Sequence, residues 1–291
     1  MRPSREPKFA RSTAKGTVEA SPRHGLARVL SRVGVCSRSE ATRRIAAGRV
    51  RLNGAVVRDP EIPADPDVDR IEIDGVTVHA GERVYIALNK PRGLVVSAAD
   101  EHGRDTVYAL LDGSDLPWLA PAGRLDRASE GLLLLCNDPA WAARITDPAS
   151  HVAKTYRVQV KGTPDQATLR HLCAGVVDRG ERLSAESLRV IGGGEKNSWL
   201  EVVLAEGRNR QIRRMLAACG HDVLRLMRVA IGEVELGDLP KGAWRRLTEP
   251  EIGSLAGMEA GGRGGGKCGL SRQTARHRSR SPRPANPDRA R

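Results

Sequence analysis

One carboxylate and one phenol are the first candidates for chemistry in this sequence of 291 residues. Asp126 lies in the run Arg124-Leu125-Asp126-Arg127 between two apolar segments, and loops on a rigid scaffold often carry chemistry. A carboxylate there could act as a nucleophile or a base, although a lone loop aspartate is more often a turn or cap residue. Tyr156 offers a flat ring and a polar tip to a base, but on its own it predicts only a core tyrosine.

An arginine of the segment EGRNRQIRRM (206–215) is the third candidate. A helix is predicted from Arg210 to Cys219, with an apolar stripe of Ile212, Met215, Leu216 and Cys219. At about 100° per residue, Arg213 lies nearest to that stripe, whereas Arg210 and Arg214 point towards solvent or RNA. Arg213 is therefore expected to reach inward.

The elements that would position these residues do not follow the regular strand–helix–strand order of a parallel sheet. This mixture favours an α+β fold with a mainly antiparallel sheet. Tyr156 is expected to share a strand face with Val158 and Val160, and Thr163 is expected to cap a helix that begins with Pro164. Further strands are predicted over 84–90, 131–136 and 199–205.

Composition excludes several classes of function. No apolar run approaches the roughly 20 residues of a membrane span, and no apolar block follows the basic N-terminal residues. We therefore expect neither a membrane protein nor a secretory signal, and predict a cytoplasmic chain. The five cysteines lack metal-ligand or redox spacing, so no metal site is expected. Cys136, Cys173 and Cys219 are predicted to be small buried side chains.

Charge indicates a polyanionic partner, because the net charge is +13 and the pI is about 10.2. Residues 1–24 and 257–291 are predicted to be disordered basic tails, which serve either as RNA tethers or as segments without a role. Between the tails, residues 25–58 have a net charge of +7 and residues 59–83 of −6. This reversal indicates one small domain with a single basic face.

The region after the first tail predicts two helices followed by a hairpin. The first helix begins near Leu26, and Ser37 and Glu40 have the spacing of a capping box for the second. Asn53-Gly54 suits a tight hairpin turn. The polar face of this region gathers arginines that could bind phosphates bidentately: Arg38, Arg43, Arg44, Arg49 and Arg51.

The run LARVLSRVGVCSRSEATRRIAAGRVRLNG closely resembles the S4 RNA-binding domain. Several protein families use that domain, so the resemblance implies binding of structured RNA and no particular activity. We assign residues 25–83 to this domain and residues 84–256 to a second, catalytic domain.

Four ordered motifs of the second domain resemble the RsuA/RluB family of ribosomal RNA pseudouridine synthases. They are NKPRG (89–93), AGRLDRASEGLLLLCND (122–138), KTYRV (154–158) and EGRNRQIRRM (206–215). With the S4-like region, the resemblance covers about residues 25–250. It implies conversion of a uridine to pseudouridine in ribosomal RNA, with no metal or organic cofactor.

The resemblance also implies roles for single residues. Asp126 would be the essential catalytic residue, Tyr156 would contact the target base, and Arg213 would pair with Asp126. Burial would raise the pKa of the Asp126 carboxyl, and a close Arg213 would lower it. The other basic residues of the motif regions are expected to contact RNA: Lys90, Arg92, Arg124, Arg208, Arg210 and Arg214.

Several alternatives stay open from the sequence. The chain could be a non-catalytic ribosomal RNA-binding or assembly factor, or a hydrolase that releases the base, although glycoside hydrolases usually need two carboxylates. The motif wording is nearer to members that act on large-subunit (23S) than on small-subunit (16S) RNA. No heptad or apolar stripe suggests a dimer, so a monomer is expected.

Overall fold

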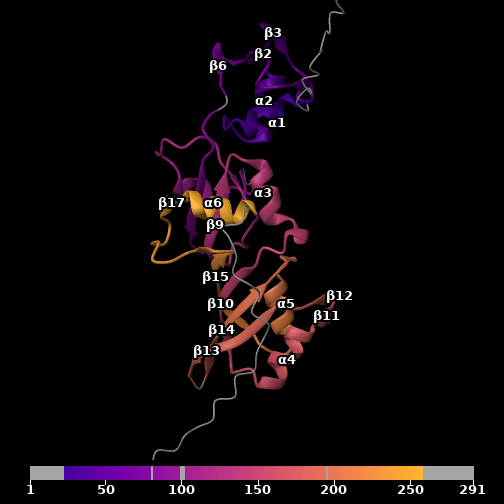
Figure 1. The fold of residues 1–291 in the computed structure, drawn as a ribbon, viewed down its shortest axis with the longest axis vertical. Coiled ribbons are helices and arrows are strands. Elements are labelled where there is room, and N and C mark those ends of the chain that lie inside the picture. Colours follow the sequence, from indigo (N-terminus) through magenta and orange to yellow (C-terminus); the bar gives the residue numbers. More distant parts are fainter. Residues whose placement is uncertain (1–22, 80, 99–101, 195, 258–291) are drawn as a thin grey trace, which may run out of the picture.

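The computed structural model describes residues 23–79, 81–98, 102–194 and 196–257. Two units follow one another along the long axis of the molecule (Figure 1): a small one from β1 to β6 and a larger one from β7 to α6. The predicted tails lie almost entirely outside the described residues. Among the helices that the structure describes, none is long and apolar enough to cross a membrane.

The small unit packs two helices against short antiparallel strands around its own apolar core. Leu26, Leu30, Ala41, Ile45 and Val50 are fully buried in that core. Its elements are β1 (His24–Gly25), α1 (Leu26–Arg32), α2 (Arg38–Ala46), β2 (Val50–Leu52), β3 (Ala55–Val57), β4 (Pro63–Ala64), β5 (Ile71–Ile73) and β6 (Val76–Val78).

Local signals in this unit behave largely as predicted. Asn53 and Gly54 have φ angles of 52° and 84° and connect β2 to β3, as a tight hairpin requires. Ser37 caps α2 by accepting from the Glu40 amide at 3.1 Å. The returning half of the capping box is not formed, because the Glu40 carboxylate binds Arg43 and Arg44 instead.

The large unit is built on a nine-stranded sheet, antiparallel except where β15 pairs with β9. The main strand order is β13-β14-β10-β15-β9-β7-β17, with β8 and β16 as short additions. The strands are β7 (Tyr85–Lys90), β8 (Ala120–Pro121), β9 (Glu130–Cys136), β10 (Lys154–Lys161), β13 (Ser187–Gly193), β14 (Asn197–Leu204), β15 (Val223–Ile231), β16 (Val234–Glu235) and β17 (Trp244–Arg246). The expected α+β fold with a mainly antiparallel sheet is confirmed.

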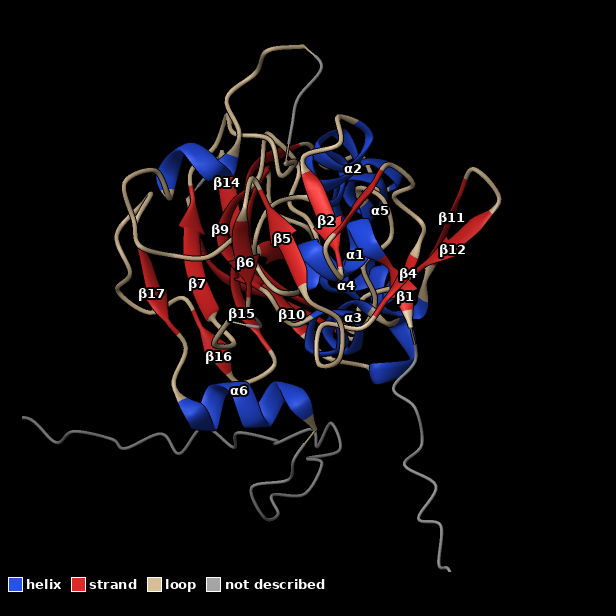
Figure 2. Cartoon of the chain, turned by 90° about the horizontal axis from the view of Figure 1, so that it is seen from above, coloured by secondary structure: helices blue, strands red, loops and turns tan. Residues whose placement is uncertain are grey.

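Helices and a hairpin cover this sheet. They are the short η1 (Val107–Leu110) and η2 (Pro148–Ser150), the helices α3 (Pro139–Thr146), α4 (Gln166–Ala174), α5 (Gln211–Ala218) and α6 (Glu249–Ala256), and the hairpin of β11 (Val176–Asp178) and β12 (Glu181–Leu183). Figure 1 shows α3 and α6 beside the middle of the molecule and α4, α5 and the hairpin gathered at one end. In Figure 2, α6 lies across one end of the strands.

Strand β9 is buried on both faces and separates two apolar cores. Leu133 and Leu135 belong to one core with Ile212 of α5, whereas Leu132 and Leu134 belong to the other with Trp141 of α3. The unbroken apolar run of β9 therefore reflects two buried faces, as its sequence indicated.

Two local predictions for the large unit are corrected. Asp165, rather than Thr163, caps α4, because its carboxylate accepts from the Thr168 amide at 2.7 Å. Cys136 is buried as predicted, but Cys173 and Cys219 are half-buried.

The two units touch at a backbone contact. The Trp118 amide donates to the Gly34 carbonyl at 2.8 Å, and Gly34 has a φ of 81°. A side chain at Gly34 would approach Pro117 and Asn137 within 3.3 Å. The end of α1 therefore lies against the large unit, at a segment that precedes the Asp126 loop in the sequence.

Candidate active site around Asp126

Asp126 lies in the loop between β8 and β9. Ala122 and Leu125 are buried and anchor this loop on the core, while the Asp126 side chain remains 36% exposed. The Asp126 carbonyl accepts from the Ser129 amide at 2.9 Å, which closes a turn directly before β9. The carboxylate is thus held on a fixed loop and is open to a substrate.

Lys90, at the end of β7, holds this loop by hydrogen bonds from the interior. Its ammonium is fully buried and donates to the carbonyls of Pro91, Asp126 and Ser129 at 3.1, 3.3 and 2.9 Å. Burial lowers the pKa of Lys90 to about 8, although Asp126 and Glu130 act in the opposite direction. The prediction that Lys90 contacts RNA is therefore wrong in this structure, because its donors face carbonyls in the interior.

A second link joins the NKPRG segment to the same loop. The Gly93 amide donates to the Arg127 carbonyl at 2.8 Å, and Arg127 Nε donates back to the Gly93 carbonyl at 3.0 Å. Two motifs that are separate in the sequence therefore form one rigid support for Asp126.

Arg210, not Arg213, makes the ion pair with Asp126. Arg210 Nη1 lies 3.5 Å from Asp126 Oδ2, and among the described residues no other cation lies within ion-pair distance of that carboxylate. The pairing of Arg213 with Asp126 that the resemblance implied is therefore not seen in this structure. Arg210 lies just before α5 in a left-handed conformation, with φ of 50°. A residue outside the helix does not follow the 100° spacing of those inside it.

Arg213 does reach inward, as predicted, but it binds carbonyls. Its guanidinium donates to the carbonyls of Val223 at 3.3 Å and Ala128 at 3.4 Å, and its buried Nε has no partner among the described residues. Burial lowers the pKa of Arg213 and Arg210 adds to this effect, whereas Asp126 opposes it. Arg213 thus supports the loop that follows Asp126.

Arg214 is a structural anchor, and its prediction as an RNA contact is wrong. Its side chain is only 13% exposed and donates to the carboxylates of Asp178 and Glu181 at 2.5 and 2.6 Å. It also donates to the Asp178 carbonyl at 2.9 Å. Arg214 thereby fastens the β11–β12 hairpin to α5.

Tyr156 lies on β10 and is buried with Val158 and Val160, as the strand pattern predicted. It belongs to the same core as Leu125, the residue before Asp126. Its hydroxyl has no hydrogen-bond partner within the described part of the chain. The ring therefore belongs to the core near the Asp126 loop, and its hydroxyl is available to a ligand.

Glu130 is a residue that the sequence analysis missed. It is buried at the start of β9 and binds Arg225 and Lys241, the latter at 3.1 Å. Burial alone would raise the pKa of Glu130, but these two partners reverse the effect and lower it. The sequence feature that could have revealed Glu130 is its position at the edge of the apolar run of β9, where a buried charge needs a partner of opposite charge.

The remaining predicted RNA contacts are exposed at the surface. Arg92 and Arg124 are exposed, and Arg208 is exposed although it pairs with Glu206 at 3.0 Å. In the small unit, Arg38, Arg43, Arg44 and Arg49 make ion pairs with acids of the same unit, and Arg51 donates to the Gly54 carbonyl. Ion pairs at the surface contribute little to stability, so phosphates could replace these acids at low cost.

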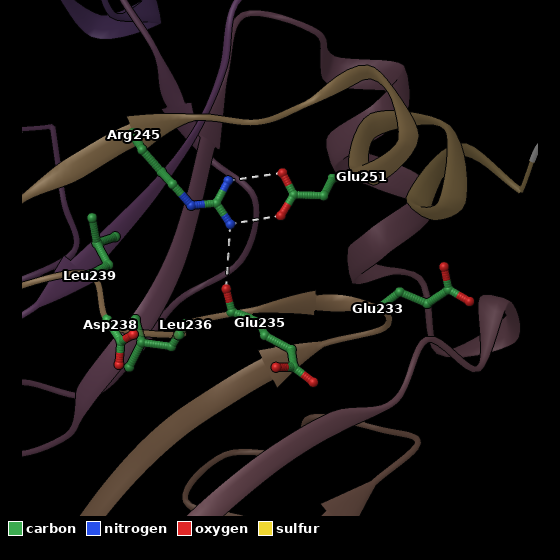
Figure 3. A pocket seen from close by; sticks show the side chains of 8 residues that line it. Glu233, Glu235, Leu236, Asp238, Leu239, Arg245 and Glu251 are labelled. Atoms are coloured by element: carbon green, nitrogen blue, oxygen red, sulfur yellow. Dashed lines mark hydrogen bonds and ion pairs between the residues drawn. The ribbon is translucent and has the colours of Figure 1, made fainter.

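The largest of the recesses characterised among the described residues lies elsewhere, beside β16 and α6, with a volume of about 490 Å³. Glu233, Glu235 and Asp238 line it, and its Arg245 is held by Glu251 at 2.6 Å (Figure 3). Excess negative charge would repel RNA phosphates. This recess therefore does not suit a polyanion, unlike the surface around Asp126.

Comparison with known proteins matches both units. Residues 84–218 match the RNA pseudouridylate synthase family, and residues 25–68 match the S4 domain. An RNA pseudouridine synthase of Aquifex aeolicus is 39% identical over 228 residues, which cover 78% of this chain and 91% of the relative. "Ribosomal large subunit pseudouridine synthase B" of Bacillus subtilis is 36% identical over 236 residues, which cover 80% of this chain and 96% of the relative.

A solved structure shares the fold. The crystal structure of a pseudouridylate synthase aligns with a TM-score of 0.57 and 32% identity, over 81% of this chain and all of the other chain. The sequence and structural comparisons therefore agree on the same group of enzymes.

Proposed function

Because this chain belongs to the RsuA/RluB family of RNA pseudouridine synthases, we propose that it isomerises one uridine of large-subunit ribosomal RNA, with Asp126 as the catalytic carboxylate. The name of the Bacillus subtilis relative supports the large subunit as the target. The observation that carries the proposal is the half-exposed Asp126 carboxylate, held on a loop by buried Lys90 and paired with Arg210.

The reaction breaks the N1–C1′ bond of uridine, turns the uracil and forms a C5–C1′ bond. The C5 hydrogen leaves as a proton and N1 takes up a proton, so the product is an isomer of the substrate. Asp126 would supply the electron pair, either by attack on C1′ or by removing a proton from the ribose. Arg210, which lies 3.5 Å from Asp126 Oδ2, would orient that carboxylate. Tyr156 would stack on the base or accept the proton late in the cycle.

The target base must leave its stack before Asp126 reaches C1′, and this flipping costs a few kcal/mol. Phosphate contacts of the exposed arginines would offset that cost. The RNA-binding unit is proposed to span residues 25–83 and the catalytic unit residues 84–256. We propose that the chain acts as a cytoplasmic monomer.

Tritium release from RNA labelled at uracil C5 tests the proposal, because each turnover releases that hydrogen. Unmodified large- and small-subunit transcripts are compared, with Asp126→Asn as the matched inactive control. Release from the large-subunit transcript by wild type alone is expected. Release from the small-subunit transcript alone would show that the target uridine lies in small-subunit RNA. Release by Asp126→Asn would overturn the catalytic assignment.

Two other outcomes address the remaining alternatives. Free uracil in the supernatant would indicate a hydrolase. Normal RNA binding without release from either transcript would indicate an assembly factor or another RNA substrate.

A further inference from the structure

Two buried cations without counter-ions lie on adjacent strands of the large unit. Lys154, the first residue of β10, is 9% exposed, and Arg228 of β15 is 5% exposed. Among the described residues, neither makes an ion pair with a carboxylate. Burying an unpaired charge costs several kcal/mol, so two such charges side by side require an explanation.

The strand register brings these two side chains together around Tyr156. Arg228 lies opposite Tyr156, while the next pair is Thr155 with Ala230, so β15 carries an extra residue in a bulge at this point. Lys154 precedes Tyr156 by two residues and shares its strand face. Arg228 and Lys154 are thus diagonal neighbours beside the tyrosine proposed to contact the base.

The electrostatics agree with this placement. Burial lowers the pKa of Lys154, and the positive charge of Arg228 lowers it further. No acid acts in the opposite direction on Lys154. The pair is therefore a local excess of positive charge in the interior.

The Arg228 guanidinium also has a donor without a hydrogen-bond partner among the described residues. Its Nε donates to the Leu132 carbonyl at 2.8 Å, across the point where β9 and β15 separate. Its buried Nη2 has no partner in the described part of the chain. A buried donor without a partner often marks the position of an absent ligand.

We propose that Lys154 and Arg228 form a phosphate site, which holds a backbone phosphate of the substrate RNA beside the target uridine. A guanidinium and an ammonium together match the charge and acceptor geometry of a phosphate. Because both cations are recessed, the phosphate reaches them only when the target nucleotide leaves the helix. The proposal rests on the function proposed above for Asp126 and Tyr156, and it predicts an effect on turnover rather than on initial RNA binding.

The first test needs no RNA. Thermal unfolding of wild type, Lys154→Met and Lys161→Met is compared in sodium phosphate and in sodium chloride at equal ionic strength. Lys161 is the exposed lysine at the other end of β10 and serves as the matched control. The additional stabilisation by phosphate is expected in wild type and Lys161→Met, and is expected to be smaller in Lys154→Met.

In chloride alone, Lys154→Met should unfold at a higher temperature than wild type, because it removes a buried uncompensated charge. Equal phosphate effects in all three proteins would overturn the site. The comparison with Lys161→Met removes the general stabilising effect of phosphate as a salt.

The second test measures turnover by tritium release on a short RNA that contains the target uridine. A neutral methylphosphonate replaces each of the two flanking phosphates in turn. At one of the two flanking phosphates, the neutral substitution should lower the kcat of wild type by about 10- to 100-fold. Lys154→Met should have a low kcat on unmodified RNA, and the same substitution should lower it little further. Lys154→Arg should recover part of the rate.

Equal losses in wild type and Lys154→Met at both positions would overturn the proposal, as would full activity of Lys154→Met. Wild type could be inactive on large-subunit RNA and still gain more thermal stability from phosphate than Lys154→Met does. In that case the proposed RNA target is wrong, whereas the phosphate site at Lys154 is supported.

Discussion

At the residue scale, two nearby arginines of the candidate site play different parts. Arg210 pairs with Asp126 at the surface, whereas Arg213 binds two carbonyls in the interior. An exposed pair contributes about 0–1 kcal/mol to stability, so its value lies in orienting the carboxylate.

We therefore expect Arg210→Gln to lower kcat by about 10-fold or more without a change in thermal stability. Arg213→Gln should lower both kcat and the unfolding temperature, because the carbonyls of Val223 and Ala128 lose a charged donor. Tritium release and thermal unfolding measure both effects. Arg189→Gln, an exposed arginine of β13, is the control. An unchanged rate for Arg210→Gln would contradict the role of the pair.

The pH dependence of stability tests the burial of Lys90. Its pKa is about 8 in the folded protein against about 10.5 in the unfolded chain. Between these values the unfolded chain binds more protons, so stability increases as pH rises through this window. Relative to Lys90→Met, wild type should gain up to about 3 kcal/mol between pH 8 and 10.5.

Urea unfolding of both proteins at several pH values measures this gain. Lys161→Met, which removes an exposed lysine, should follow wild type. A constant difference between wild type and Lys90→Met across the window would show that Lys90 titrates normally in the folded protein.

The sequence pointed to Asp126 and Tyr156 as candidates, but it could not predict which residues contact them. The helical wheel treated Arg210 as part of α5, and only the left-handed backbone at that residue turns its side chain towards Asp126. Similarly, no local pattern shows that Lys90 is buried, because two of its three acceptors, the carbonyls of Asp126 and Ser129, come from another segment of the chain.

At the element scale, the parallel pairing of β9 with β15 is the shortest strand pairing along the main strand order of the sheet. It consists of Met227 with Glu130 and Arg228 with Gly131. A Cβ at Gly131 would lie 2.2 Å from the Arg228 carbonyl oxygen, and its φ is 100°. Only glycine therefore allows the two strands to approach so closely.

Gly131→Ala is expected to destabilise the protein by roughly 3 kcal/mol or more, since backbone atoms of β15 must move. Gly180→Ala in the turn between β11 and β12 is the matched control. Gly180 has a φ of 77° but no atom within 4 Å of an added Cβ, so it should cost only about 1–2 kcal/mol. Urea unfolding compares the two, and equal losses would contradict the steric argument.

Most elements were predictable because their signals are local. The Asn53-Gly54 turn, the Ser37 cap and the β9 run each depend on a few adjacent residues. The strand order, the bulge in β15 and the ion pairs of Glu130 join distant segments, and no local pattern encodes them.

At the scale of the whole molecule, the small unit is expected to supply RNA affinity and the large unit the chemistry. Arg43→Gln combined with Arg49→Gln should raise KM and leave kcat unchanged. For every RNA phosphate that is no longer bound, the slope of log affinity against log salt should fall by about 0.7–0.9. Arg189→Gln, on β13 at the edge of the large sheet, is the control.

RNA binding measured from low to moderate salt provides these slopes, and tritium release provides kcat. If the double substitution changed kcat as strongly as affinity, the small unit would take part in catalysis rather than in recognition alone.

The strand order also has a consequence for the folding of the large unit during synthesis. β7 and β9 are made early, but the outer edge of β7 is covered by β17 and part of the outer edge of β9 by β15, and both of these strands follow roughly a hundred residues later. Until then the two strands carry unpaired backbone edges, which favour aggregation and slow the folding of the unit. The loop of Asp126 leads directly into β9, so the Asp126 carboxylate is expected to reach its final place only after β15 and β17 have been synthesised.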